Sequence, residues 1–268
     1  MSSSCFGNWV PHVKHTEDAP DFTLLDKRIT ELIAGDDDAA QHADALKAQV
    51  AKLPAMRAAC IMPRQLDEAA LEALKEYFRI LRMLHRRVPS SKMVFKWRCT
   101  LTPRGGGLLS KDPSISKGGL GLEMRAVAYQ IGVCCAAIAS RLSEGQESSK
   151  AAKWYKNAYH VFNYARDCIE VDLQKDCELN RDLKPDVLHA LSRVMLAQAA
   201  NVFQLVMTES AIAISEKKTD PLQKHEREKS LFQFAILAHM TYRTAREKIF
   251  PLFAEYPAAT LECTVLEQ

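Results

Sequence analysis

The amino-acid sequence predicts an all-α protein: a curved helical solenoid of antiparallel helix pairs with a small β-hairpin near residues 92–102. Three observations predict this fold class. Only 10 glycines and 11 prolines occur among 268 residues, so turns are few and long helices are favoured. Apolar side chains recur at intervals of three and four over long stretches, which is the helical period. The breaks between the later helical segments are short, which makes neighbouring helices antiparallel.

The first third of the chain predicts one irregular segment and three helices. Residues 1–20 show no period, whereas residues 21–33 repeat apolar side chains at helical spacing. An alanine-rich helix is expected over 38–60. The clearest helix follows Asp67, whose carboxylate can cap it. This helix ends in the basic cluster His85–Arg87, and cations there complement the negative end of the helix dipole.

Residues 92–102 change character. Val94, Phe95 and Trp97 are β-branched or aromatic residues that favour a strand. No other segment predicts a strand as clearly. Residues 103–119 are rich in glycine and proline and are predicted to be a loop.

Four long helical segments follow, over 119–143, 148–177, 185–215 and 222–252. The first is apolar almost all round, so we expect it at the centre of the assembly. Consecutive helical hairpins of this length resemble the stacked pairs of α-solenoids such as tetratricopeptide repeats. We therefore expect a single helical domain over 21–252, preceded by the irregular segment and followed by a tail at 253–268.

Composition excludes several classes of function. The net charge of +3 argues against a general nucleic-acid binder. No run of 18 apolar residues predicts a membrane span, and the first residues do not resemble a secretory signal. The eight cysteines form no CxxC pair, so we expect free thiols in a reducing compartment and a cytoplasmic chain.

The sequence contains only incomplete versions of nucleotide-binding and catalytic motifs. The glycines at 105–107 lack the lysine of a phosphate-binding loop, and Gly119 and Gly121 lack the third glycine of a dinucleotide fingerprint. The SxxK match at Ser114–Lys117 lacks its partner motifs. The histidines are scattered. The sequence therefore predicts a protein that is not an enzyme, holds no cofactor or metal, and acts by offering a groove to a partner.

Four motifs are similar to a known family. They are the FKWRCTLTP strand from Phe95, the LGxE entry that starts at Leu120, the LKPDVLHAL segment, and the MLAQAxxxF run that ends at Phe203. In order and spacing they resemble the BRO-type domain of the ALIX-like proteins, over residues 12–245. Domains of this family run considerably further, so a shortened C-terminal end with exposed apolar surface is expected. That expectation leaves homo-oligomerisation through this end open.

The resemblance implies a function. Family members are non-enzymatic ESCRT-associated adaptors, and their concave face receives an amphipathic C-terminal helix of an ESCRT-III subunit. This implies a role in endosomal sorting and multivesicular body formation, in the cytoplasm at the periphery of endosomes. Peripheral association with the endosomal membrane stays open, and no nucleic-acid partner is implied.

The resemblance also assigns site residues one by one. Phe203 corresponds to the aromatic anchor of the family's patch. Lys153 corresponds to a rim lysine, and Lys150 lies beside the position of a second one. Val206 stands where the family has a further rim lysine.

Two aliphatic anchors fall on Leu231 and Ala235, when the chain is aligned through Tyr242. Alanine replaces a large aliphatic residue there, although Phe232 or Phe234 could compensate for it. Val206 and Ala235 support an alternative function, a structural or oligomerising helical scaffold that has lost ESCRT-III binding.

Overall fold

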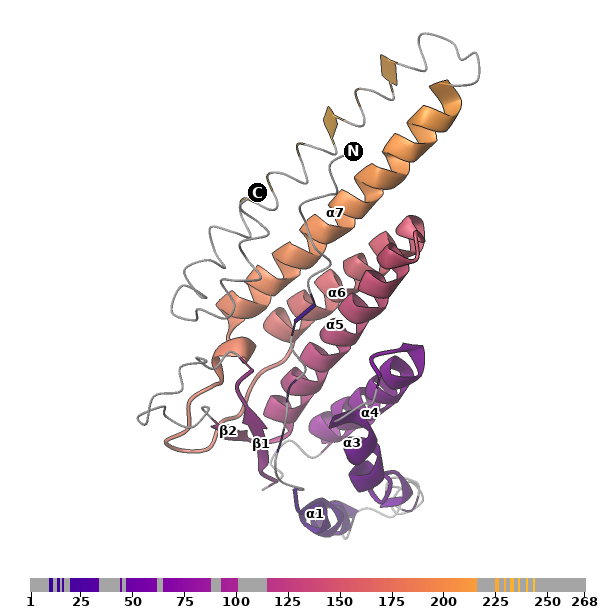
Figure 1. The fold of residues 1–268 in the computed structure, drawn as a ribbon. Helices are drawn as coiled ribbons and strands as arrows, with labels where there is room; N and C mark the ends of the chain where they lie inside the picture. The colour runs from indigo at the N-terminus through magenta and orange to yellow at the C-terminus, as the bar shows by residue number, and fades with distance from the viewer. Residues whose placement is uncertain are drawn as a thin grey trace, which may run out of the picture.

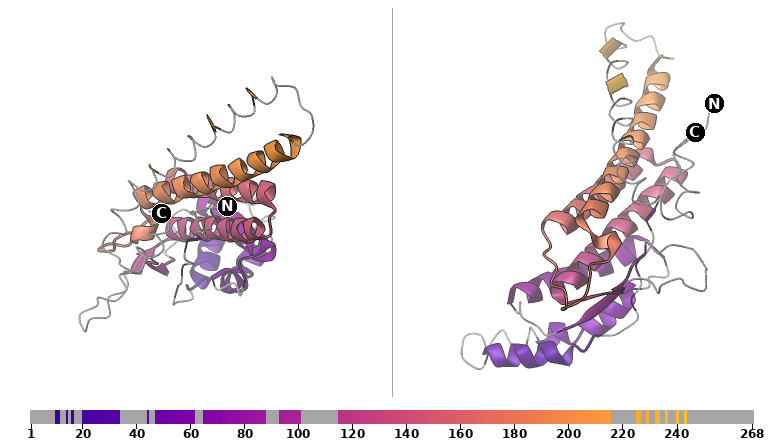
Figure 2. Two further views of the ribbon diagram at one scale, coloured as in Figure 1. Left: turned by 45° about the horizontal axis from the view of Figure 1, so that its top comes forward. Right: turned by 90° about the vertical axis from the view of Figure 1, so that its left-hand side faces the viewer.

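The computed structural model describes most of the chain between residues 10 and 243. The described residues are 10–11, 14, 16, 20–33, 44, 47–61, 65–87, 93–100, 115–215, 225–226, 229, 232–233, 236, 240 and 243. Figure 1 shows long helices stacked side by side, with a small sheet at one end of the stack. The two further views in Figure 2 show that the stack is curved, which confirms the predicted helical solenoid.

The N-terminal part contains the helices α1 (Thr23–Ile33), α3 (Leu53–Ile61) and α4 (Glu68–Arg87) among its described residues. Asp21 caps α1, because its Oδ1 accepts a hydrogen bond of 3.0 Å from the backbone amide of Thr23. The predicted cap of α4 is confirmed, since Asp67 Oδ1 accepts a hydrogen bond of 2.9 Å from the amide of Ala70. Helix α4 turns one apolar face to the core and leaves its charged face outside.

The β element is a two-stranded antiparallel sheet of β1 (Phe95–Arg98) and β2 (Ile115–Gly118). The first strand was predicted, but the second falls in the predicted loop 103–119. It was missed because Ser116 takes the inward position where a strand usually carries an apolar residue. Ser116 is fully buried, and its hydroxyl donates a hydrogen bond of 2.9 Å to the carbonyl oxygen of Glu178.

Three long helices form the stack itself: α5 (Leu120–Glu144), α6 (Ser148–Asp167) and α7 (Pro185–Ser215). Helix α5 packs between α4 and α6, and α6 packs against α7 (Figure 1). By length and composition α5 is the one described helix that could cross a membrane, but 94% of its most apolar window is buried inside the protein. It is therefore the central helix that its all-round apolar character predicted.

Helix α6 ends ten residues earlier than the predicted 148–177. The segment after it turns back to the start of α5, where the Asp172 carbonyl and carboxylate accept the amides of Gly119 and Gly121 at 3.0 and 2.9 Å. The approach is too close for side chains. A Cβ on Gly121 would lie 2.2 Å from the carbonyl oxygen of Glu170. Packing thus explains the glycine of the LGxE entry, Gly121, and the preceding Gly119.

A buried carboxylate joins four elements at this end. Glu123 of α5 is fully buried and accepts hydrogen bonds from three side chains: Arg57 Nε at 2.8 Å, Tyr77 Oη at 2.8 Å and Trp97 Nε1 at 2.6 Å. The donors come from α3, α4 and β1. Because a buried charge is tolerated only when it is paired and hydrogen-bonded, these three donors fix how the four elements pack.

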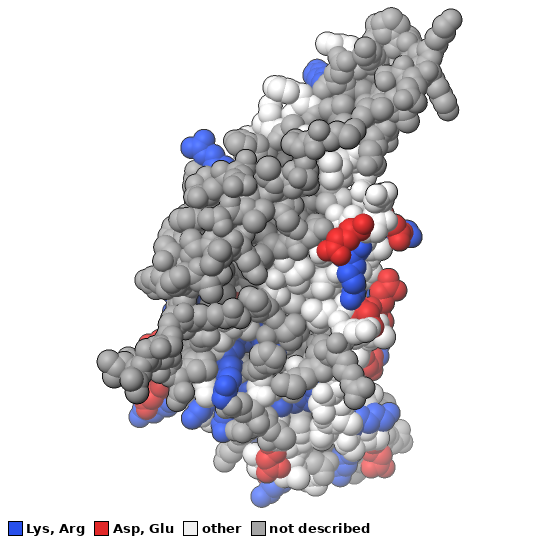
Figure 3. Space-filling model, viewed as in Figure 1, with Lys and Arg blue, Asp and Glu red and all other residues white. Residues whose placement is uncertain are grey.

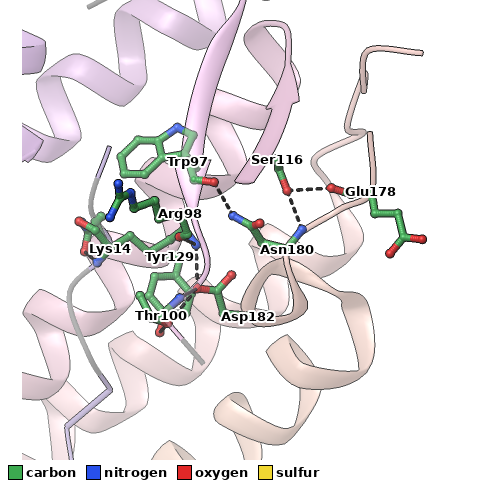
Figure 4. Close-up of polar contacts among 10 residues, drawn as sticks. Lys14, Trp97, Arg98, Thr100, Ser116, Tyr129, Glu178, Asn180 and Asp182 are labelled. Carbon is green, nitrogen blue, oxygen red and sulfur yellow. Dashed lines mark hydrogen bonds and ion pairs between the residues drawn. The ribbon is translucent and has the colours of Figure 1, made fainter. Parts of the chain in front are cut away.

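A second buried ion pair holds residues of the N-terminal segment in the core (Figure 4). Lys14 Nζ lies 2.6 Å from Asp182 Oδ2, and both side chains are fully buried. Asp182 belongs to the short 3-10 helix η1 (Arg181–Leu183) that precedes α7. The amide and hydroxyl of Thr100 also donate to Asp182, each at 2.7 Å. A residue of the segment predicted to be irregular is therefore part of the folded core.

Candidate partner-binding surface

Helix α7 emerges from the core in its second half. From Val187 to Val202 most of its side chains are buried, and then Phe203 is 37% exposed. Val206 lies one turn further on and is half-buried. The aromatic anchor that the sequence resemblance assigns therefore reaches the surface of the protein, where a partner can contact it.

The two rim lysines lie on α6 and are both exposed. Lys150 pairs with Glu147, and this carboxylate raises the pKa of the Lys150 side chain. Arg166 of α6 contacts His189 of α7. Because the helices are antiparallel and rise about 1.5 Å per residue, Lys153 and Phe203 lie at nearly the same level along the pair.

An apolar stripe lies on the described helical fragments that follow α7. Phe232, Ile236 and Met240 are 67%, 43% and 60% exposed. They are spaced by four residues, so they share one helix face. Figures 1 and 2 show fragments of this segment, coloured gold, alongside the C-terminal half of α7. We call Phe203 and these three side chains the apolar surface.

Basic side chains stand at both ends of the stripe. Lys229 precedes Phe232 by one turn and Arg243 follows Met240 by one turn, and both are exposed. On a helix these residues lie on the same face as the stripe. A partner for this face needs apolar side chains in the middle and acidic groups beside them.

The two predicted aliphatic anchors, Leu231 and Ala235, lie outside the described residues, so their assignment stays a prediction. Among the described residues, their sequence neighbours Phe232 and Ile236 are exposed. The sequence analysis named Phe232 only as a compensating residue and missed Ile236 and Met240. The signal that could have found them is the spacing of four residues from Phe232 to Met240.

In the described part of the chain, metal-binding or reactive side chains are not grouped into a site. No three His, Cys, Asp or Glu side chains there are placed to hold a metal ion. The six described cysteines are free thiols. Burial raises the pKa of Cys60 and Cys134 to about 11 and that of Cys135 to about 12, so these thiols stay protonated and unreactive at neutral pH.

Comparison with known proteins finds relatives of greater length. Programmed cell death 6-interacting protein of Homo sapiens is 29% identical over 185 residues, which are 65% of this chain and 20% of that protein. Apoptosis-linked gene 2-interacting protein X 1 of Caenorhabditis elegans is 31% identical over 147 residues, 53% of this chain and 16% of that protein. The pH-response regulator protein palA/RIM20 of Saccharomyces cerevisiae is 30% identical over 135 residues, 50% of this chain and 19% of that protein. The matched regions thus span a fifth or less of these relatives.

Solved structures share the fold. An "ALIX BRO1 CHMP4C complex" superposes with a TM-score of 0.61 at 20% identity, covering 97% of this chain and 85% of that chain. A structure reported for endosomal targeting by the Bro1 domain gives a TM-score of 0.65 at 14% identity, covering 91% of this chain and 60% of that one. The family model for the BRO1-like domain matches residues 11–244. With this match over most of its length, the chain belongs to the BRO1-like domain family.

Proposed function

We propose that the chain is a non-enzymatic, ESCRT-associated adaptor whose apolar surface binds an amphipathic helix of an ESCRT-III subunit. The observation that carries the proposal is the exposure of Phe232, Ile236 and Met240 along one helix face. Large apolar side chains that are exposed in a row typically mark an interaction site. The role would be in endosomal sorting and multivesicular body formation, in the cytoplasm at the periphery of endosomes.

The energetics suit a helical partner. Burying a large apolar side chain contributes about 1.5–3 kcal/mol, and three such anchors offset much of the entropy lost on association. An amphipathic helix repeats its apolar residues every three or four positions, so it matches a stripe of the same period. The expected result is a moderate affinity that depends on a few anchor residues.

The charges define the partner further. Three exposed basic residues accompany the apolar surface. Lys229 and Arg243 flank the stripe, and Lys153 lies at the level of Phe203 along the α6–α7 pair. We expect the bound helix to carry acidic residues beside its apolar stripe, because rim charges set orientation and association rate. Family membership supports this function, and one neighbour in fold was solved in a complex with CHMP4C.

The proposal is tested by calorimetric titration with a peptide of the C-terminal helix of CHMP4C. The unsubstituted chain should bind it, and the double variant Phe232→Asp with Ile236→Asp should bind at least tenfold more weakly. A tenfold loss corresponds to about 1.4 kcal/mol. Phe203→Asp tests the anchor on α7 separately. Leu24→Asp is the matched control, since Leu24 is also exposed (39%) but lies on α1, and its affinity should not change.

The alternative is a structural scaffold that has lost ESCRT-III binding. Val206, in place of the rim lysine that the resemblance implies, favours it. Under this alternative the peptide does not bind the unsubstituted chain, and light scattering shows an oligomer that the Phe232→Asp, Ile236→Asp variant dissociates. Either equal peptide affinity of all variants or no binding at all would overturn the adaptor proposal.

A further inference from the structure

The apolar stripe lies on a helix face that also carries charges of both signs. Every described residue between 225 and 243 is helical and exposed. At 3.6 residues per turn, these positions lie within about 120° of one another around the helix axis, so they form one face. Along this face, Glu226 comes before the stripe and Arg243 comes after it. The face therefore runs from a carboxylate through large apolar side chains to a guanidinium.

The order of residues along this face is self-complementary. Three pairs of its residues share one midpoint in the sequence, between residues 234 and 235. The pairs are Glu226 with Arg243, Lys229 with Met240, and Gln233 with Ile236. If two such helices pair antiparallel about a two-fold axis at this midpoint, the two members of each pair face each other across the copies. The apolar side chains then meet in the middle, and Glu226 of each copy faces Arg243 of the other.

Charge distinguishes the two possible directions of pairing. In a parallel pair, Glu226 would face Glu226 and Arg243 would face Arg243, so like charges would meet at both ends. Antiparallel pairing replaces both repulsions by attractions. Ion pairs between exposed side chains add little affinity, so these charges set the direction of pairing and apolar burial supplies the binding.

Few other described charges lie at this end of the molecule. In Figure 3 the described charged side chains gather on the middle and lower parts, and few lie at the upper end, where Figure 1 shows the end of α7 and the gold fragments. On the C-terminal half of α7, Phe203 and Leu205 are exposed apolar residues as well. Two copies that meet at this end therefore bring few described charges together besides those on the face of the stripe.

We propose that the apolar stripe is a two-fold interface between two copies of this chain, and that the dimer withholds the stripe from a partner helix. A second copy supplies what the stripe requires of a partner, apolar side chains in the middle and an acidic group beside them. Three partly exposed side chains are few for a permanent dimer, so the dimer is weak and depends on protein concentration. The regulatory part of this inference rests on the proposed function, whereas the interface itself does not.

Sedimentation equilibrium of the full chain tests the interface. Between about 1 μM and 1 mM the chain should pass from monomer to dimer. Phe232→Ser removes the aromatic side chain of the stripe and should raise the dissociation constant of the dimer at least about tenfold. A chain that stays monomeric over this range, or a dimer that Phe232→Ser leaves unchanged, overturns the proposal.

Charge reversal tests the direction of pairing. Glu226→Arg alone and Arg243→Glu alone each turn two attractions into two repulsions, so each should raise the dissociation constant about tenfold. The double variant Glu226→Arg, Arg243→Glu restores opposite charges across the antiparallel pair. Its dissociation constant should return to within about twofold of that of the unsubstituted chain. Failure of this rescue overturns the antiparallel interface.

Arg82→Glu is the matched control for charge reversal. Arg82 is exposed on α4, which packs against α3 and α5. Its reversal changes the net charge as much as Arg243→Glu does, but it should leave the dissociation constant unchanged. Equal effects of the two reversals would show that net charge controls association, and would overturn the proposal. Circular dichroism should show the same helix content in all variants.

The regulatory part is tested with the CHMP4C helix peptide. Added peptide should convert dimers to monomers, and its apparent affinity should fall as the protein concentration rises above the dissociation constant of the dimer. Peptide that binds the dimer without dissociating it overturns the regulatory part. The two proposals fail separately. A dimer that binds no peptide contradicts the adaptor proposal and its regulation but supports the interface, whereas peptide binding by a chain that never dimerises contradicts the interface alone.

Discussion

The two ends of the molecule place charged and apolar groups in opposite ways. At the sheet end, the charged side chains of Glu123, Lys14 and Asp182 lie in the interior and hold separate segments together. At the end where α7 leaves the core, Phe232 and Met240 lie outside. The first arrangement fixes one packing of the chain, because buried charges tolerate no loss of their partners. The second leaves large apolar side chains exposed, which is the basis of the proposed binding function.

The largest effect is expected from Glu123→Gln. The substitution keeps the shape of the side chain but removes the carboxylate charge that pairs with the buried guanidinium of Arg57. Breaking a buried ion pair in this way typically costs about 3–5 kcal/mol of unfolding free energy. Urea denaturation followed by circular dichroism measures it.

Glu76→Gln is the control for this variant, since it breaks the exposed pair with Arg79 on α4. Exposed pairs contribute about 0–1 kcal/mol. Losses of the same size in the two variants would contradict the structural role assigned to the sheet end.

The next largest effect is expected at the start of α5. A Cβ on Gly121 would lie 2.2 Å from a backbone oxygen, so Gly121→Ala forces the segment after α6 to move. Overpacking of this kind costs about 1–3 kcal/mol. At the other end of α5, a Cβ on Gly145 would meet nothing closer than 3.4 Å, so Gly145→Ala should be neutral or slightly stabilising. Urea denaturation of both variants measures the difference: Gly121→Ala should lower the unfolding free energy and Gly145→Ala should not.

Much of the fold could be predicted from the sequence, because its helices are long and periodic. Helices α4 and α5 were expected at nearly their observed bounds, and Asp67 was expected as a cap. What could not be predicted is long-range pairing. Lys14 and Asp182 are 168 residues apart, and each looks like an ordinary surface charge in the sequence. Local patterns report which face of an element is apolar, but not which distant charge it meets.

The candidate site shows the same division. Phe203 was expected from the family resemblance, and its exposure agrees with a binding role. The alignment through Tyr242 assigned the aliphatic anchors to Leu231 and Ala235, which lie outside the described residues, whereas the described exposed side chains are those of Phe232, Ile236 and Met240. On a helix one residue changes the direction of a side chain by about 100°. A resemblance alone therefore could not decide which face of this helix is presented to solvent.

A smaller effect is expected on the pH dependence of stability, and it comes from a buried thiol on α5, between the two ends. Burial raises the pKa of Cys135 to about 12, above its usual value near 9. The folded state therefore favours the neutral thiol. The stability that this thiol contributes is fully present below pH 9 and is lost as the pH rises toward 12. At pH 10 the free energy of unfolding is therefore lower by roughly 1 kcal/mol.

The measurement is the unfolding free energy at pH 8 and pH 10, for the unsubstituted chain and for Cys135→Ala. Between pH 8 and pH 10, the unfolding free energy of Cys135→Ala should fall by about 1 kcal/mol less than that of the unsubstituted chain. Cys168→Ala is the control because Cys168 is exposed, and its pH dependence should match that of the unsubstituted chain. Identical pH dependence in all three proteins would show that Cys135 is not held in a dry interior.

The smallest effect on stability is expected at the apolar surface. Phe232→Ser and Ile236→Ser remove large side chains, yet both residues are exposed, so the unfolding free energy should change by no more than about 0.5 kcal/mol. Leu81→Ala on the buried face of α4 gives the contrast, with an expected loss of about 2–5 kcal/mol. Thermal and urea denaturation of the three variants makes the comparison. If the serine variants lost as much as the core variant, the stripe would be packed within the protein, and the difference between the two ends would not hold.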